Sequence, residues 1–185
     1  MRLVHKTPMR SKFYLILLGV VLLTLAIVVR SGMLMSKHPG DPITVAMRAS
    51  MAETAPQLSS EDAYLIRKDY PTAYTTSTGL MYVSHSPGTG AATPRIGDTV
   101  EANYVGHLLD GTPFDSSYKH GAPLSFQVGT GRVIKGWDEA FLTMKKGARR
   151  TLIIPYWLAY GAAGQPPLIP PHATLVFEVE LVDFH

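Results

Sequence analysis

The sequence of 185 residues contains no cysteine, which excludes a disulfide framework and thiolate chemistry. Its seven histidines are scattered, and no pair of them has the spacing of metal ligands on a helix or in a Cys-x-x-Cys-like loop. The sequence also offers no convincing nucleophile. We therefore expect a protein that binds no metal and needs no cofactor.

Acidic residues are scarce at the N-terminus, with none among the first twelve positions. Residues 1–78 hold 9 Lys and Arg against 5 Asp and Glu, whereas residues 79–185 hold 8 against 9. The basic balance of the chain therefore belongs to its N-terminal part. A nucleic-acid-binding domain would carry a basic patch of its own, so we expect no nucleic-acid partner.

One long apolar run, FYLILLGVVLLTLAIVV at Phe13–Val29, has seventeen residues without a charge. A helix of this length spans roughly 25 Å, near the lower limit for a bilayer. We expect an uncleaved transmembrane signal anchor at residues 13–30, with a cleaved signal peptide or a buried core helix as alternatives. The basic residues 1–12 then lie in the cytoplasm, and the C-terminal part faces the periplasm or a lumen. Cleavage would give a secreted or periplasmic protein instead.

Residues 31–78 resemble a solvated linker, because they hold few large aliphatic side chains and several prolines. A short helix is expected at residues 59–68, where Ser59 and Asp62 have a capping spacing and Pro71 follows. An alternative is a helical arm for dimerisation or for holding client proteins.

The remaining residues, 79–185, predict one α+β domain. Segments that alternate or are rich in β-branched residues predict strands at residues 80–84, 100–107, 124–128, 150–154 and 174–182. Trp137, Ala140, Phe141 and Met144 form an apolar stripe at helical spacing, which predicts one short helix. We expect an antiparallel sheet wrapped around that helix.

Four motifs follow one another in this domain: YVGHLLDGTPFDSS at Tyr104–Ser117, VIKGWDEA at Val133–Ala140, LAYGAAG at Leu158–Gly164 and LIPPHATLVFEVEL at Leu168–Leu181. Together they resemble the FK506-binding-protein (FKBP) family of peptidyl-prolyl cis-trans isomerases. The resemblance covers residues 79–184. It implies the FKBP-like half-barrel around one short α-helix, proline-containing polypeptides as substrates, and binding of macrolides such as FK506 or rapamycin.

The resemblance also assigns roles to individual residues. It places Asp115, Tyr160, Ile134 and Trp137 in the catalytic site, with Trp137 as the floor and with the Ile134 N–H and the Tyr160 hydroxyl as donors to the substrate. It makes the other pocket residues substrate-binding: Tyr104, Phe114, Phe126, Val133, Leu168, Ile169 and Phe177. Taken singly, Trp137, Phe126 and Phe177 could be plain core, Tyr104 could be a buried tyrosine with a satisfied hydroxyl, and Asp115 could cap a local turn.

The sequence departs from the family at the edge of this pocket. His120 stands where the family often has an arginine paired with the buried aspartate, and Leu124 and Leu158 replace common aromatic residues.

The expected function is isomerisation of Xaa-Pro bonds in exported or membrane-proximal proteins, as a folding helper. The alternatives are a catalytically weak binding module and a holdase chaperone.

Overall fold

The computed structural model describes residues 56–185, which form one compact unit from Pro56 to His185. The predicted transmembrane segment at residues 13–30 lies outside the described residues. Across residues 56–185, no helix combines the length and the apolarity needed to cross a membrane.

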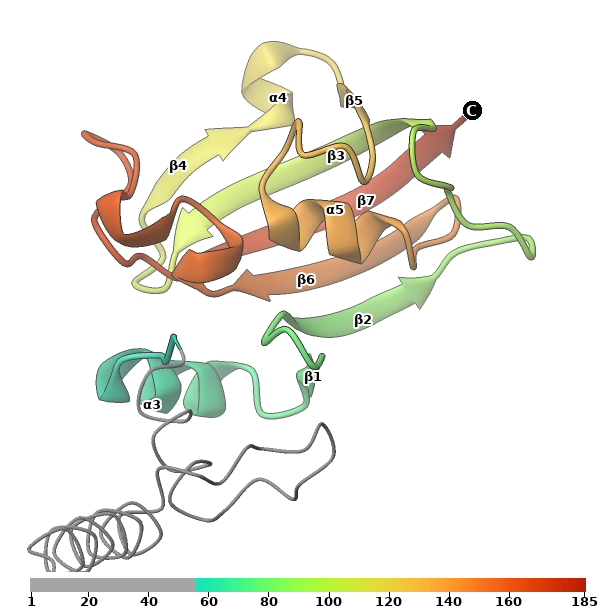
Figure 1. Ribbon diagram of the computed structural model, residues 1–185. Coiled ribbons are helices and arrows are strands. Elements are labelled where there is room, and N and C mark those ends of the chain that lie inside the picture. The colour runs from blue at the N-terminus through green and yellow to red at the C-terminus, as the bar shows by residue number, and fades with distance from the viewer. Residues whose placement is uncertain (1–55) are drawn as a thin grey trace, which may run out of the picture. The chain divides into compact units, whose positions relative to one another are not determined.

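An antiparallel sheet forms the centre of the unit (Figure 1). Its strands run in the order β1-β2-β6-β7-β3-β4, and β5 also pairs with β3. The strands are β1 (Tyr74–Thr75), β2 (Met81–Pro87), β3 (Thr99–Leu108), β4 (Pro113–Ser116), β5 (Leu124–Gln127), β6 (Ala148–Ile154) and β7 (Leu175–Phe184). The five strands predicted from the sequence are present as β2, β3, β5, β6 and β7, whereas β1 and β4 were not predicted.

The predicted short helix is α5 (Lys135–Phe141), which crosses one face of the sheet (Figure 1). Its buried side chains, Trp137, Ala140 and Phe141, pack with Leu152, Ile154 and other inward-facing residues of the sheet into the main core. Because successive strand residues point to opposite faces, the alternating residues of β3 and β7 leave the other face of the sheet partly to solvent. The α+β architecture expected from the sequence is confirmed.

Part of the opposite face is covered by α3 (Ser60–Asp69), the short helix predicted at residues 59–68. Ser59 caps it by accepting a hydrogen bond from the Asp62 N–H at 2.9 Å. Ile66 of this helix is buried in a second, smaller core with Met81, Ile153 and Val176. The compact unit therefore includes a helix and a strand that we had assigned to the linker at residues 31–78.

Three further short helical segments shape the ends of the sheet. The helix α4 (Ser117–His120) directly follows β4, and the 3-10 turns η1 (Tyr156–Leu158) and η2 (Gly161–Ala163) follow β6. A long loop then runs from Gly164 to the start of β7, and Gln165 and Ile169 pair across it through two backbone hydrogen bonds of 2.8 and 3.0 Å. These segments surround the cavity described next.

Candidate active site

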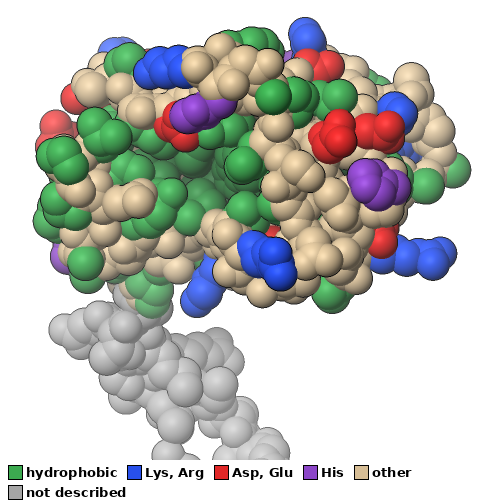
Figure 2. Space-filling model, turned by 90° about the horizontal axis from the view of Figure 1, so that it is seen from above, with side chains coloured by type: hydrophobic (Ala, Val, Ile, Leu, Met, Phe, Trp, Pro, Cys, Tyr) green, Lys and Arg blue, Asp and Glu red, His purple; other side chains and the backbone are tan. Residues whose placement is uncertain are grey.

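A cavity of about 450 Å³ opens between α5, the sheet and the loop that precedes β7. Figure 2 shows it as a hollow floored by hydrophobic side chains on one face of the molecule. Ten of the eleven side chains predicted for the site line this cavity, namely Tyr104, Phe114, Asp115, Val133, Ile134, Trp137, Tyr160, Leu168, Ile169 and Phe177. Motifs spread over more than seventy residues of sequence therefore meet in one place.

Trp137 packs at the centre of an aromatic cluster. Its indole ring lies 5.1 Å from the ring of Tyr104 and 5.2 Å from that of Phe177, both at steep angles typical of edge-to-face pairs. Phe114 meets Phe177 in the same way at 5.4 Å. Within the described residues, the buried Nε1–H of Trp137 has no hydrogen-bond partner. The cluster gives the cavity a dry, apolar and well-packed floor.

Phe126 is the one predicted pocket residue that does not line the cavity. Its ring lies in the core, 5.6 Å from Trp137 and 5.4 Å from Phe141. Leu124, two residues earlier on the same face of β5, reaches the cavity instead and stays partly exposed. Phe126 therefore supports Trp137 from within the core, and the prediction that it lines the pocket was wrong.

A backbone position explains how the aromatic side chains fit together. Gly106 on β3 pairs with Asp115 of β4 on one side and with Phe177 of β7 on the other. A Cβ atom at Gly106 would lie 2.7 Å from the ring of Phe114 and 2.8 Å from that of Phe177. Glycine is required here because the two rings occupy the space that a side chain would take.

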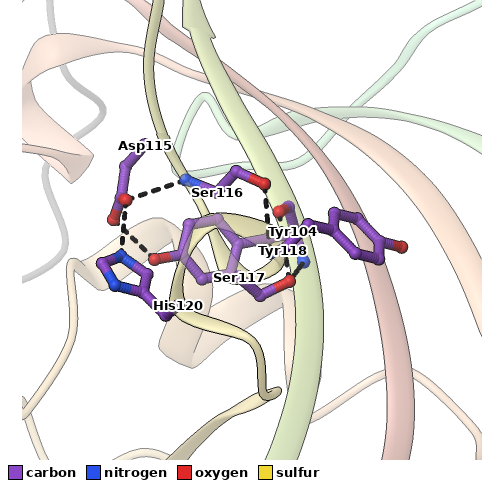
Figure 3. Close-up of polar contacts among 6 residues, drawn as sticks. All are labelled: Tyr104, Asp115, Ser116, Ser117, Tyr118 and His120. Atoms are coloured by element: carbon purple, nitrogen blue, oxygen red, sulfur yellow. Dashed lines mark hydrogen bonds and ion pairs between the residues drawn. The ribbon is translucent and has the colours of Figure 1, made fainter.

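Among the described residues that line the cavity, Asp115 alone carries a carboxylate. Its Oδ2 accepts a hydrogen bond of 2.5 Å from the Tyr104 hydroxyl, and its Oδ1 accepts the Ser116 N–H at 2.8 Å. His120 Nε2 lies 2.9 Å from the same Oδ1, so it takes the ion-pair position in which the family often has arginine. Figure 3 shows the side chains of Tyr104 and His120 converging on this carboxylate.

The contacts of Asp115 determine its ionisation. Burial raises the pKa of the Asp115 carboxyl, but hydrogen bonds from Tyr104, His120 and the Ser116 N–H outweigh burial and leave the pKa below its usual value. Burial, followed by the hydrogen bond to Asp115, raises the pKa of the Tyr104 hydroxyl strongly. Asp115 is therefore an ionised acceptor at neutral pH, and Tyr104 is a neutral donor.

The backbone N–H of Ile134 and the hydroxyl of Tyr160 are donors on the cavity wall that have no acceptor within the described residues. The N–H of Ile134, the residue that caps α5, is not used by any backbone or side-chain acceptor there. The hydroxyl of Tyr160 is likewise without a partner, and burial raises its pKa, so it stays protonated. Both groups can donate to the carbonyl oxygens of a bound peptide.

The rim of the cavity contains residues that sequence reasoning did not select. Arg132, Gln165, Pro166 and Pro167 line it beside Leu124 and the exposed Leu168. Arg132 directly precedes the motif at Val133–Ala140, and Gln165 directly follows the motif at Leu158–Gly164. This adjacency is the one signal in the sequence that points to them. No cluster of metal-ligating side chains is present within residues 56–185.

Comparisons with known proteins agree with this geometry. The sequence profile of the family described as FKBP-type peptidyl-prolyl cis-trans isomerase matches residues 90–182. The chain is 54% identical over 106 residues to the mouse (Mus musculus) peptidyl-prolyl cis-trans isomerase FKBP4, covering 57% of this chain and 23% of that protein. It is 52% identical over 109 residues to FkpA, the FKBP-type isomerase of Escherichia coli K12, covering 59% and 39%.

A yeast relative and a solved structure are also similar to this chain. The Saccharomyces cerevisiae isomerase FPR2 is 57% identical over 88 residues, which are 47% of this chain and 65% of that protein. The crystal structure of AtFKBP13 superposes with a TM-score of 0.58 at 39% identity, covering 61% of this chain and 98% of that one. The chain thus spans less than half the length of FKBP4 and FkpA.

Proposed function

The chain belongs to the FKBP-type peptidyl-prolyl cis-trans isomerases, and on that premise we propose that its cavity accelerates rotation about Xaa-Pro bonds in exported or membrane-proximal proteins. The observation that carries this proposal is the cavity itself: an aromatic floor, the ionised carboxylate of Asp115 and the unused donors of Ile134 and Tyr160 lie around one space. Proline-containing segments of unfolded polypeptides are the proposed substrates.

The physical argument begins with the peptide bond. Partial double-bond character gives the Xaa-Pro bond a slow rotation, with a barrier of about 18–20 kcal/mol. Twisting the bond breaks the resonance and makes the amide less polar. A dry aromatic site therefore binds the twisted amide better than the planar one, and such differential binding is what lowers a barrier.

Individual residues have separate parts in this mechanism. The proline ring rests on Trp137, and the Ile134 N–H and the Tyr160 hydroxyl hold the neighbouring carbonyl groups so that the substrate cannot turn as a whole. Asp115 faces the amide that twists, and Tyr104 and His120 hold its carboxylate in place. Rotation then takes place about one bond while both ends of the peptide are fixed, and no covalent step is involved.

The alternatives differ in how they respond to changes in the cavity. A binding module would hold proline-containing segments without turning them over, and a holdase would depend on exposed apolar surface elsewhere. Phe177→Ala opens the aromatic floor, whereas Tyr64→Ala changes an exposed side chain of α3 and serves as control. We expect the first variant to lose at least tenfold in kcat/KM on a Xaa-Pro peptide and the second to keep its activity. Equal suppression of client aggregation by both variants, with no turnover by either or by the parent, would favour the holdase.

We further propose that the chain is anchored in a membrane by residues 13–30, with its C-terminal domain on the periplasmic or luminal side. The support is the uncharged run Phe13–Val29 and the purely basic charge of residues 1–12. A C-terminal alkaline phosphatase fusion of the full chain, expressed in a bacterium, tests this. Phosphatase activity that stays in the membrane fraction supports the anchor. Activity that is released together with a shortened chain supports a cleaved signal peptide. An inactive fusion contradicts export.

Binding of FK506 or rapamycin is proposed for the same cavity. Its support is the apolar floor and the free donors of Ile134 and Tyr160, which a macrolide with carbonyl groups can use. Displacement of a fluorescent macrolide by a Xaa-Pro peptide would confirm a shared site, and independent binding of the two would contradict it.

A further inference from the structure

Arg132 is a cation at the rim of the cavity and has no partner among residues 56–185. Two charged side chains line the cavity, Asp115 and Arg132. The carboxylate of Asp115 is already engaged by Tyr104, His120 and the Ser116 N–H. Arg132 is exposed and makes no hydrogen bond, ion pair or ring contact with any residue of the 56–185 unit. Its positive charge is therefore left for a ligand to neutralise.

The backbone around Arg132 is held firmly relative to the floor of the cavity. Asp138 of α5 accepts hydrogen bonds from the N–H groups of Gly129 and Gly131, each at 2.8 Å. Trp137 is the neighbour of Asp138 on the same helix, and Val133 and Ile134 follow Arg132 directly. The guanidinium thus extends from a fixed point beside the residues that we propose to hold the proline and its carbonyl group.

We propose that Arg132 makes this site prefer proline-containing segments that have an aspartate or glutamate adjacent to the proline. The inference rests on the proposed isomerase function. A guanidinium stays charged at any physiological pH and matches a carboxylate with two parallel hydrogen bonds. The remaining rim side chains are uncharged, so they neither compete for Arg132 nor repel an acidic substrate; they are Leu124, Gln165, Pro166, Pro167 and Leu168.

The test uses the full chain and peptides that differ in one residue beside the proline. Glutamate, glutamine and lysine are compared on each side of the proline, and kcat/KM is measured at low ionic strength. We expect the glutamate peptide to exceed its glutamine counterpart by about two- to fivefold on one side, the size of an exposed ion pair. The preference should shrink in 0.5 M salt, where charges are screened within a few ångströms.

Two variants separate a local effect from one of overall charge. Arg132→Gln removes the proposed contact, whereas Arg95→Gln removes the same charge from an exposed arginine that does not line the cavity. Arg132→Gln should abolish the preference while keeping turnover of the glutamine peptide, and Arg132→Glu should reverse it in favour of lysine. Arg95→Gln should leave the preference intact.

The outcomes distinguish this inference from the function on which it rests. A parent chain that turns over the glutamine peptide without preferring glutamate, or a preference that survives Arg132→Gln, overturns the role of Arg132 alone. An equal loss of preference in both glutamine variants would also overturn it, since overall charge would then be the cause. A parent chain that accelerates none of the peptides would instead overturn the proposed isomerase function.

Discussion

At the scale of single residues, the chemistry of the cavity centres on how Asp115 is held. A carboxylate beside an aromatic floor is disfavoured by burial, yet three donors keep it ionised. The strongest geometric constraint among them is the Tyr104 hydroxyl, which lies 2.5 Å away on the neighbouring strand. The pKa of the Asp115 carboxyl therefore depends on the hydrogen bond from Tyr104, and the pKa of the Tyr104 hydroxyl depends on Asp115.

This linkage predicts the effect of Tyr104→Phe. The lost hydrogen bond stabilised the charged carboxylate, so its removal should raise the pKa of Asp115, while the ring of residue 104 keeps its packing against Trp137. A carboxyl ¹³C titration by NMR between pH 2 and 7 measures the shift. Tyr160→Phe removes a hydroxyl that makes no hydrogen bond to Asp115, so it is the control and should leave that titration nearly unchanged. An unchanged or lower pKa for Asp115 in Tyr104→Phe would contradict the linkage.

At the scale of structural elements, the cavity depends on the close approach of β3, β4 and β7. Gly106 is the point where they meet, because the rings of Phe114 and Phe177 close over it. The predicted consequence is that Gly106→Ala displaces one or both rings into the cavity. We expect kcat/KM to fall by at least tenfold while the sheet remains folded.

Circular dichroism and thermal unfolding of Gly106→Ala would show whether the fold persists. The matched variant is Gly136→Ala, in which the added Cβ meets Ile154 at 2.6 Å in the core rather than the two rings. It should lower stability without the same selective loss of activity. A Gly106→Ala protein with the activity of the parent would show that the rings do not need their present positions.

The second core beneath α3 gives another prediction for an element. Ile66 is 6% exposed and packs on Met81, Ile153 and Val176 of the sheet. Asp62 of the same helix accepts a 2.6 Å hydrogen bond from the hydroxyl of Thr174, the buried residue just before β7. The helix is therefore part of the folded unit and not a free spacer.

Ile66→Ala should lower the free energy of unfolding by about 2–3 kcal/mol, the usual cost of truncating a buried aliphatic side chain. Urea denaturation measures the difference. Tyr64→Ala on the same helix, where the side chain is 64% exposed, should change the free energy by no more than about 0.5 kcal/mol. Equal effects of the two variants would mean that α3 is not docked as described.

Much of this arrangement could be predicted from the sequence because the longer strands alternate and the α5 stripe has helical spacing. The strand β1 could not, since two residues carry no periodicity. The strand β4 could not either, because Phe114 is the one large apolar residue in Pro113–Ser116 and no alternation is visible there. Ten of the eleven residues that the family motifs predicted for the pocket line it. The error at Phe126 arose because alternation gives the face of a strand but not how far along it a cavity extends. Arg132 and Gln165 were not predicted because polar side chains at the rim of a cavity do not contribute to the hydrophobic periodicity of the sequence.

At the scale of the whole molecule, an ion pair connects the last strand of the folded unit to the rest of the sheet. Asp183 near the end of β7 pairs with Lys146 in the turn before β6 at 2.8 Å. The hydrogen bond from Lys146, with smaller contributions from the Phe184 N–H and nearby charges, lowers the pKa of the Asp183 carboxyl. A carboxyl whose pKa is lowered by folding stabilises the fold above its unfolded value of 3.8, and this contribution is lost as the pH falls below it.

We therefore expect the thermal midpoint to fall as the pH drops from 5 towards 2. Asp183→Asn should be less stable than the parent at pH 7, and the two proteins should converge near pH 2. Asp69→Asn, which breaks a longer contact of 3.8 Å with the adjacent Lys68, should follow the parent at every pH. A constant gap between Asp183→Asn and the parent from pH 7 to 2 would rule out this linkage.

The most direct test of the account is the rate of cis-trans exchange in a Xaa-Pro peptide, measured by NMR magnetisation exchange with a small amount of the full chain in mild detergent. The account predicts that exchange becomes faster in proportion to protein concentration, that FK506 abolishes the acceleration, and that Asp115→Asn weakens it. Exchange that stays at the uncatalysed rate, while signals of Trp137 and Phe177 shift on peptide binding, would contradict it. The cavity would then hold proline without turning it over.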